Sequence, residues 1–125
     1  MINEDYITED YVSYEVAKLL KEKGFDEKTL SYYEDNVLCR GDWFEWNRSP
    51  LGHISAPTHQ MAMKWLREIF HIHIRLIHSI DESYTFEIYP MAGKYRCKCF
   101  EDYTYYSSYE EAVEAALKYV LENLI

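Results

Sequence analysis

The alternation of apolar and polar residues is clearest between residues 55 and 80, where a helical pattern passes almost directly into a strand pattern. A helix over about Thr58 to Ile69 would have one apolar side, formed by Met61, Ala62, Trp65, Leu66 and Ile69. Either Ser55 or Thr58 can cap its first turn, and Pro57 suits that position because its missing N–H is not needed there. From His71 to His78 the apolar residues recur at every second position, which predicts a β-strand.

Two further amphipathic helices are predicted near the ends of the chain. The first covers about Ser13 to Lys23, where Ser13 can cap the first turn and Gly24 can end the helix in a left-handed conformation. The last helix begins after Ser107 and Ser108, each of which precedes a glutamate by three residues and so forms a capping box. Its apolar side has the most regular spacing in the sequence and consists of Tyr109, Ala112, Val113, Ala116, Leu117, Val120, Leu121 and Leu124.

The sequence between the second and last helices predicts an antiparallel sheet. Asp81-Glu82 joins the strand His71–His78 to the alternating segment Ser83–Tyr89, a length suited to a hairpin. Tyr95–Phe100 predicts a third strand, and Tyr103–Tyr106 either extends it or adds a fourth. We therefore expect one α+β domain over residues 1–125, with an antiparallel sheet of three to four strands and helices packed on one face. The expected order is α-(irregular)-α-β-β-β-α, and the length of 125 residues agrees with a single domain.

Residues 26–54 show no clear period. DEKTLSYYED could hold a short helical turn and NVLCR a short strand, whereas GDWFEWNRSPLGH has the glycines and proline of a loop. This stretch nevertheless carries large aromatic side chains, and such side chains on a loop either pack back onto the core or form a binding surface. The chain also contains 13 tyrosines, a residue type that suits both half-buried sheet positions and recognition surfaces. The candidate binding residues are Tyr32, Tyr33, Trp43, Phe44 and Trp46.

The charge of the chain argues against direct binding to nucleic acid. Asp and Glu number 22 against 13 Lys and Arg, which leaves a net charge of −9 and no basic cluster for phosphate contacts. Such a surface promotes solubility and repels nucleic acid, although an acidic surface can also imitate DNA. The apolar runs are shorter than the roughly 20 residues that span a bilayer, and the acidic N-terminus is unlike a secretory signal. We expect a cytoplasmic protein with three reduced cysteines and no membrane partner.

Metal and cofactor chemistry is weakly indicated. His71 and His73 with Cys97 and Cys99 would supply four zinc-type ligands, but strand parity places the two pairs on opposite faces of the predicted sheet. Arg40 beside Cys39 is a faint indication of an activated thiolate, without a recognisable catalytic signature. No glycine-rich phosphate loop or nucleophile elbow is present in the sequence, so we expect no cofactor, no metal and no catalytic residues.

His53 and His59 flank the start of the second helix and could bind a ligand there, although solvent exposure is commoner for such residues.

The predicted order helix–three strands–helix from residue 58 onward is that of double-stranded RNA-binding domains. Those domains contact phosphate through basic residues at the start of the last helix, where this chain has Ser107-Ser108-Tyr109-Glu110-Glu111. Direct RNA binding is therefore disfavoured.

Three segments resemble small uncharacterised proteins of Bacteroides and related gut bacteria, often encoded near phage or mobile elements. They are VSYEVAKLLKEKGFDE (12–27), SAPTHQMAMKWLREIFHIHI (55–74) and SYEEAVEAALKYVLE (108–122). The resemblance implies a bacterial cytosolic accessory protein, and it implies no activity and no functional residues.

The sequence leaves three hypotheses for function. The first is a non-catalytic interaction module of a mobile element that binds a protein partner or a small ligand through the aromatic segment 32–46, with a homodimer also open. The second is an acidic, DNA-mimic-like inhibitor of a nucleic-acid-binding protein. The third is a small enzyme, which would need a pocket that joins Cys39 or a histidine to convergent polar groups.

Overall fold

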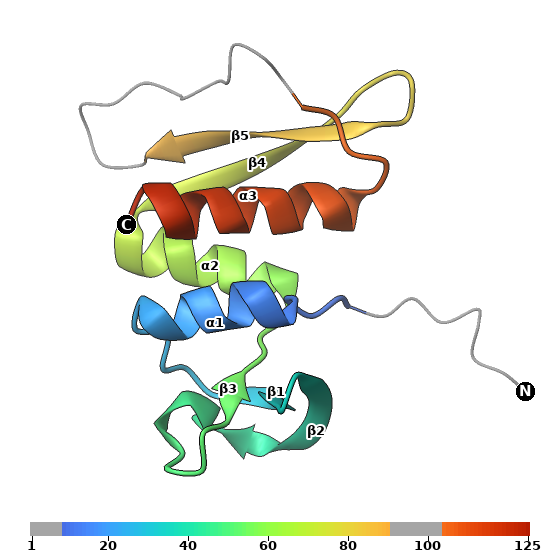
Figure 1. Cartoon of the computed structure of the whole chain (residues 1–125). Helices are drawn as coiled ribbons and strands as arrows, with labels where there is room; N and C mark the ends of the chain where they lie inside the picture. The colour runs from blue at the N-terminus through green and yellow to red at the C-terminus, as the bar shows by residue number, and fades with distance from the viewer. Residues whose placement is uncertain (1–8, 91–103) are drawn as a thin grey trace, which may run out of the picture.

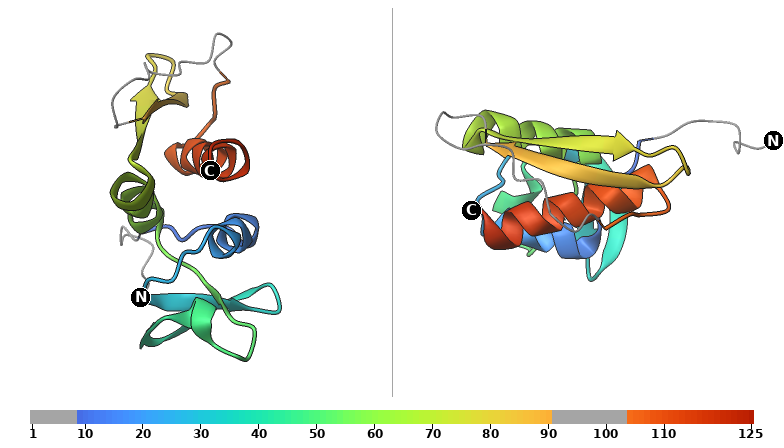
Figure 2. Two further views of the ribbon diagram at one scale, coloured as in Figure 1. Left: turned by 90° about the vertical axis from the view of Figure 1, so that its left-hand side faces the viewer. Right: turned by 90° about the horizontal axis from the view of Figure 1, so that it is seen from above.

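The computed structural model describes residues 9–90 and 104–125, which form three layers. Two helices, α2 (His59–Phe70) and α3 (Tyr109–Asn123), lie beneath a two-stranded antiparallel sheet of β4 (Ile72–His78) and β5 (Tyr84–Pro90). Helix α1 (Tyr14–Glu22) packs below them against a second antiparallel sheet, as Figures 1 and 2 show. That sheet has the strand order β2-β1-β3 and consists of β1 (Thr29–Glu34), β2 (Val37–Phe44) and β3 (Ile54–Ser55). A short 3-10 helix, η1 (Trp46–Arg48), connects β2 to β3.

The α+β class is confirmed, whereas the predicted order and the single sheet are wrong. The observed order is α-β-β-β-α-β-β-α, and the helical layer lies between two sheets. The predicted helical turn in DEKTLSYYED is strand β1, and the predicted loop contributes half of β2. Asp35 and Asn36 join these strands with positive φ angles of 49° and 69°, a turn that matches the twist of a hairpin. The inward residues of β1 are Thr29, Ser31 and Tyr33, so its buried face is too polar to show as an apolar alternation.

The helix boundaries follow the capping residues that the sequence predicts. The Ser13 hydroxyl accepts a hydrogen bond from the Val16 N–H at 3.2 Å and caps α1. Gly24 ends this helix with a φ of 93°, and the Phe25 N–H returns to the Leu20 carbonyl at 3.0 Å. Thr58, not Ser55, caps α2 by accepting from the Met61 N–H. These capping residues therefore determine where α1 and α2 begin and where α1 ends.

At the end of α2 and the start of α3 the details depart slightly from the prediction. His71 is not the first strand residue but a left-handed cap of α2 with a φ of 57°, and β4 starts at Ile72. Ser108 caps α3 by accepting from the Glu111 N–H, while the Glu111 carboxylate accepts from both the N–H and the hydroxyl of Ser107. These bonds lower the pKa of Glu111, chiefly through the Ser107 hydroxyl. The two overlapping capping boxes therefore merge into one.

The β4–β5 hairpin confirms the predicted strand pairing. Ile74 pairs with Ile88 and Leu76 with Phe86, so the apolar faces of both strands lie over α2 and α3. In the connection, the Asp81 carboxylate accepts hydrogen bonds from Ser79 and Ser83, which lower the pKa of Asp81 to about 2. Tyr106 adds one antiparallel bridge to Tyr84. The strand predicted at 95–100 lies outside the described residues.

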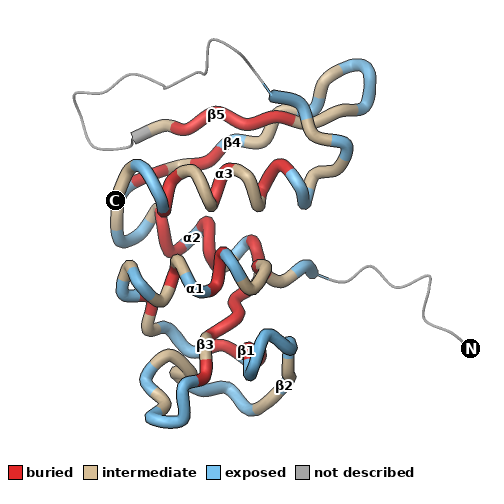
Figure 3. The backbone as a smooth tube through the Cα atoms, viewed as in Figure 1, coloured by how far each residue is buried: buried red, intermediate tan, exposed pale blue. Residues whose placement is uncertain are grey.

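The core runs through the helical layer and into both sheets, and Figure 3 shows buried backbone in every layer. Strand β2 is the exception, since most of its residues are half-buried or exposed. Most core residues of the three helices belong to the predicted apolar stripes, including Leu20, Leu66 and Leu117, each of which is fully buried. The stripe predicted for α2 is partly wrong, since Ile69 is 54% exposed and Met63, outside that stripe, is buried. Within the described residues, no helix combines the length and apolar character needed to cross a membrane.

Candidate functional site

The outer face of the three-stranded sheet carries a cluster of four aromatic rings. Burial alternates along β1, so Leu30, Tyr32 and Glu34 face away from the helices. The indole of Trp46 stacks on the Tyr32 ring, with 4.1 Å between ring centroids and 28° between planes. Phe44 meets Trp46 edge-on at 5.0 Å, and His53 lies 4.7 Å from Tyr32 and 5.2 Å from Trp46. We call Tyr32, Phe44, Trp46 and His53 the aromatic cluster.

Gly41 makes room for the centre of this cluster. A Cβ atom at Gly41 would lie 2.8 Å from Trp46 Cζ2 and 2.9 Å from Tyr32 Cε1, closer than side-chain carbons approach one another. The indole N–H of Trp46 donates to the carbonyls of Thr29 at 3.0 Å and Asp42 at 3.2 Å. These two bonds lie where β2 has extra residues relative to β1, between Arg40 and Phe44. The side chain of Trp46 thus packs over the bulge and onto the sheet, although the residue itself belongs to η1.

Asn47 fastens the loop that carries Trp46. Its amide nitrogen donates to the Phe25 carbonyl at 2.7 Å, and its amide oxygen accepts from the Ser55 N–H at 2.7 Å. The Asn47 backbone N–H in turn donates to the Ser55 hydroxyl at 2.9 Å. One side chain therefore connects η1, the end of the α1 turn and β3, and it holds the aromatic cluster in a fixed position.

His53 occupies a buried position in the cluster, contrary to the exposure expected from sequence. It is only 8% exposed, its Nδ1 lies 2.9 Å from the Ser49 hydroxyl, and its Nε2 lies 3.8 Å from the Glu34 carboxylate. Partial burial raises the pKa of Tyr32, and the neighbouring Cys39 and Glu34 raise it further. The Tyr32 phenol therefore remains protonated and can donate a hydrogen bond at neutral pH.

The structure brings together three of the five predicted binding residues. Tyr32, Phe44 and Trp46 belong to the aromatic cluster. Trp43 is 55% exposed and lines a separate polar depression of about 530 Å³ together with Asp26, Glu27, Lys28, Glu45, Arg48 and Met61. Tyr33 points the opposite way, where its hydroxyl donates to the Val12 carbonyl at 2.7 Å and its ring meets Tyr14 edge-on. Burial, followed by the nearby Glu114 carboxylate, raises the pKa of Tyr33.

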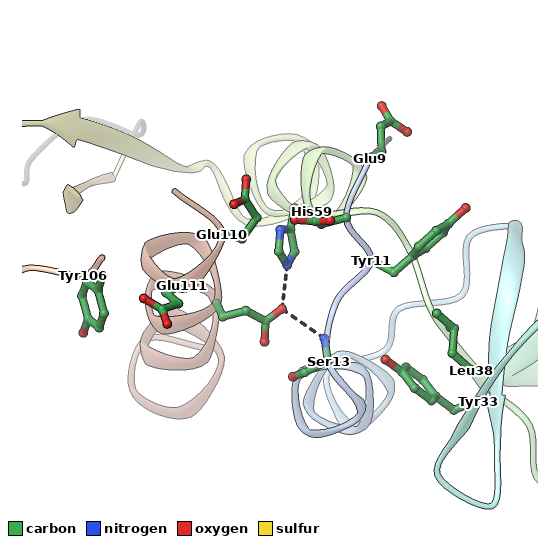
Figure 4. A pocket seen from close by; sticks show the side chains of 11 residues that line it. Glu9, Tyr11, Ser13, Tyr33, Leu38, His59, Tyr106, Glu110 and Glu111 are labelled. Atoms are coloured by element: carbon green, nitrogen blue, oxygen red, sulfur yellow. Dashed lines mark hydrogen bonds and ion pairs between the residues drawn. The ribbon is translucent and has the colours of Figure 1, made fainter. Parts of the chain in front are cut away.

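A second candidate site lies where the three helices meet; the sequence offered His59 as a possible ligand residue there, but not its partners Ser13 and Glu114. The Glu114 carboxylate oxygen Oε2 accepts from His59 Nε2 at 2.7 Å and from the Ser13 backbone N–H at 3.0 Å, and Figure 4 shows both bonds converging on it. His59 is the first residue of α2, Ser13 caps α1, and Glu114 lies in α3. Burial raises the pKa of Glu114, but the bonds from His59 and Ser13 lower it more, so the carboxylate stays ionised. The three residues are far apart in sequence, so no local motif could have indicated them.

This junction forms the floor of an open cleft of about 770 Å³. Its walls combine carboxylates with tyrosine rings and one leucine, and they comprise Glu9, Asp10, Tyr11, Ser13, Tyr33, Leu38, His59, Tyr106, Glu110, Glu111 and Glu114. Segment 9–12 reaches the cleft because it runs antiparallel to residues 57–59, with the His59 N–H donating to the Asp10 carbonyl at 2.9 Å. In Figure 4, Glu9 and Tyr11 lie on one side of His59, and Glu110 and Glu111 lie on the other.

The structure places several of the side chains that the sequence offered for metal binding or catalysis. Across residues 9–90 and 104–125, no group of three His, Cys, Asp or Glu side chains has an arrangement that could hold a metal ion. The Cys97 and Cys99 ligands of the hypothetical zinc site lie outside the described residues. Cys39 is half-buried and its thiol lies 3.5 Å from the Val37 carbonyl, without a histidine hydrogen-bonded to it. His59 joins the cleft to acidic groups, but no serine, threonine or cysteine side chain of the described chain is hydrogen-bonded to its ring.

No protein-family model, no curated protein and no solved structure matches this chain.

Proposed function

We propose that the protein is a non-catalytic interaction module that binds a protein partner through the outer face of the three-stranded sheet. The observation that carries this proposal is the concentration of exposed apolar side chains in one short stretch. Of the nine large apolar side chains that are exposed in the described residues, six lie between residues 30 and 51: Leu30, Val37, Leu38, Trp43, Phe44 and Leu51. Two of them lie apart from the aromatic cluster, since Leu38 lines the cleft where the three helices meet and Trp43 lines the neighbouring polar depression. Contiguous patches of exposed apolar side chains often mark interaction sites on soluble proteins.

The aromatic cluster and Trp43 have the composition of a binding surface. Tryptophan and tyrosine dominate the binding energy of protein interfaces because they bury a large area with little loss of conformational entropy. Gly41 and Asn47 hold Trp46 in place before any partner arrives, which reduces the entropy lost on binding. The rings also offer flat faces to a cation, which tryptophan attracts most strongly.

The charges around this surface favour a basic partner. Residues 26–54 contain six acidic and three basic residues, a net charge of −3, and Arg48 already pairs with Asp26 at 2.6 Å and Glu45 at 3.3 Å. Glu34 and Asp42 lie in the two strands that carry the cluster. We therefore expect the partner to present apolar side chains together with arginine or lysine. The resemblance to accessory proteins of mobile elements is compatible with such a role, in which the partner would be a bacterial or phage protein.

The decisive variant is the double substitution Trp43→Ala/Phe44→Ala. Both side chains are exposed, so their removal should leave the unfolding free energy nearly unchanged, whereas removing Trp46 would disturb the sheet itself. The partner would be captured from a lysate of the native cell, purified and titrated against the wild type and the variant. Ile80→Ala is the matched control, because Ile80 is fully exposed in the β4–β5 connection.

The proposal predicts that the double variant loses the captured partner while Ile80→Ala retains it. The affinity should fall only modestly between low and high salt, because apolar burial contributes more than the charge pairs that salt screens. Unchanged affinity in the folded double variant would refute the proposal. A steep loss of affinity with salt would instead favour the acidic inhibitor suggested by the net charge of −9.

A further inference from the structure

We propose that the cleft around His59 binds an organic cation, a guanidinium or alkylammonium group carried on a flexible chain. This site is distinct from the aromatic cluster, and its ligand class follows from the groups that meet in the cleft. The source of the cation is either a basic side chain of another protein or a free polyamine, and both present the same chemistry.

The first argument is an excess of uncompensated negative charge. Five carboxylates line the cleft, and no lysine or arginine occurs among its described lining residues. Glu111 is engaged by Ser107, and Glu114 by His59 and Ser13. The side chains of Glu9, Asp10 and Glu110 form no hydrogen bond or ion pair with the described part of the chain. A cation that enters the cleft would relieve the mutual repulsion of these carboxylates.

The second argument is independent of the acidic residues and concerns the hydrogen-bonding state of His59. Its side chain is only 6% exposed, and its Nε2 is bonded to Glu114. An ionised carboxylate can only accept, so Nε2 carries the hydrogen of this bond and Nδ1 is the remaining polar atom of the ring. Nδ1 has no protein partner among the described residues. Because no fully buried side-chain nitrogen or oxygen there lacks a partner, this Nδ1 must reach open space. A nearly buried ring that lines the cleft therefore has one nitrogen available to a ligand.

The space next to His59 has the size of a cationic head group. A small recess of about 170 Å³ is lined by Glu9, Asp10, Thr58, His59, Gln60, Tyr109 and Glu110. It is too small for a folded segment of protein, and its ionisable side chains other than His59 and Tyr109 are carboxylates. The ligand that satisfies such acceptors is a multiple donor with positive charge, such as the five N–H groups of a guanidinium.

The walls of the larger cleft favour an organic cation over a metal ion. Tyr11, Tyr33, Leu38 and Tyr106 provide apolar surface and ring faces for the methylene chain that carries the charge. The described carboxylates and histidines do not converge in a group able to hold a metal. An alkyl chain with a charged end matches both halves of the site, whereas a hydrated metal ion matches neither the recess nor the rings.

The test is an NMR titration of the full chain at constant ionic strength. The probes are L-argininamide, spermidine and a short acetylated, amidated peptide with a single arginine between glycines, and potassium chloride at equal ionic strength is the reference. Each organic probe should produce saturable shifts in the amide signals of His59 and Glu110 and in the side-chain nitrogen signals of His59. Tighter binding of the peptide than of argininamide would identify a protein side chain as the source, and tighter binding of spermidine would identify a free polyamine.

Substitutions distinguish binding in this cleft from the nonspecific attraction of cations to an acidic protein. Asp10→Asn/Glu110→Gln removes two carboxylates from the recess and should weaken the binding of the probes by about tenfold, equivalent to roughly 1.4 kcal/mol. Glu122→Gln removes the same kind of charge from an exposed position of α3 and should change the affinity less than twofold. Equal weakening by both variants, or shifts that potassium chloride reproduces, would overturn the proposal. The signals of Trp43 and Phe44 report on the other surface, so this outcome is independent of the proposed partner binding.

Discussion

The hydrogen bond between His59 and Glu114 should be the polar contact whose loss destabilises the fold most, and Glu114→Ala tests this directly. The substitution removes the acceptor of two donors at once, His59 Nε2 and the Ser13 N–H. The His59 ring is almost completely buried, so its Nε2–H would have no replacement acceptor unless water enters. An unsatisfied buried donor costs about 1–3 kcal/mol, and more when the lost partner was charged.

The magnitude follows from the exposure of the two donors. Ser13 is half-buried and can regain a bond to water, so its share should be at the low end of the range. The expected loss for Glu114→Ala is therefore about 2–4 kcal/mol out of a total stability of about 5–15 kcal/mol. With a urea m-value of about 2 kcal/mol per molar, the middle of the usual range, the unfolding midpoint should fall by about 1–2 M. Urea denaturation followed by circular dichroism measures it.

The pH dependence of the unfolding free energy provides a second test of the contact between His59 and Glu114. The folded-state pKa of Glu114 lies below its ordinary value of 4.5, so the carboxylate contributes stability that is fully present above that value. This contribution is lost as the pH falls through the lower folded-state pKa. The difference in unfolding free energy between the wild type and Glu114→Gln should therefore shrink below pH 4.5.

The control is Glu122→Ala, which removes an exposed carboxylate from the same helix and should change the unfolding free energy by less than about 0.5 kcal/mol. A double-mutant cycle with His59→Ala would assign the coupling to this pair. If Glu114→Ala were no more destabilising than Glu122→Ala, the argument that this carboxylate holds the three helices together would be refuted.

Two further predictions concern the aromatic cluster. Gly41→Ala should force the stacked rings of Trp46 and Tyr32 apart and destabilise the fold by about 1–3 kcal/mol. The change should be visible as a shift in tryptophan fluorescence at the same urea concentration. A spectrum and an unfolding midpoint like those of the wild type would contradict the close approach of both rings to Gly41. Asn47→Ala should cost about 1–3 kcal/mol, because the Ser55 N–H loses its acceptor and the Phe25 carbonyl its donor. Amide hydrogen exchange should show faster exchange at Ser55, and unchanged protection there would argue against the role of Asn47 as a fastener.

The sequence was most informative where the structural signal is local. Ser13, Thr58 and Ser108 each mark a helix start, because a hydroxyl next to an apolar stripe satisfies the free N–H groups of the first turn. The pairing of β4 with β5 follows for a similar reason, since a short turn joins two strands with matching alternation. These predictions depend on residues within a few positions of one another.

The three-stranded sheet shows where a local reading fails. Its buried side chains are Thr29, Ser31 and Tyr33, and its second strand is mostly exposed, so neither strand has the apolar alternation that identifies strands in sequence. The turn residues Asp35 and Asn36 were the available signal, since both types tolerate a positive φ. Asn47 is hydrogen-bonded to Phe25, 22 positions away, and to Ser55, 8 positions away, and the spacing of residues in the sequence does not indicate either bond.

By itself, the sequence determined the three helices, the β4–β5 hairpin and the aromatic character of segment 32–46, because each depends on neighbours along the chain. Only the tertiary structure decided which aromatic side chains meet. It turned Tyr33 into the core, stacked Tyr32 on Trp46 above Gly41, and separated Trp43 from both. It also joined His59 to Glu114 across 55 positions. The physical reason is the same in each case: burial and charge pairing act between side chains that folding brings together, whatever their distance in sequence.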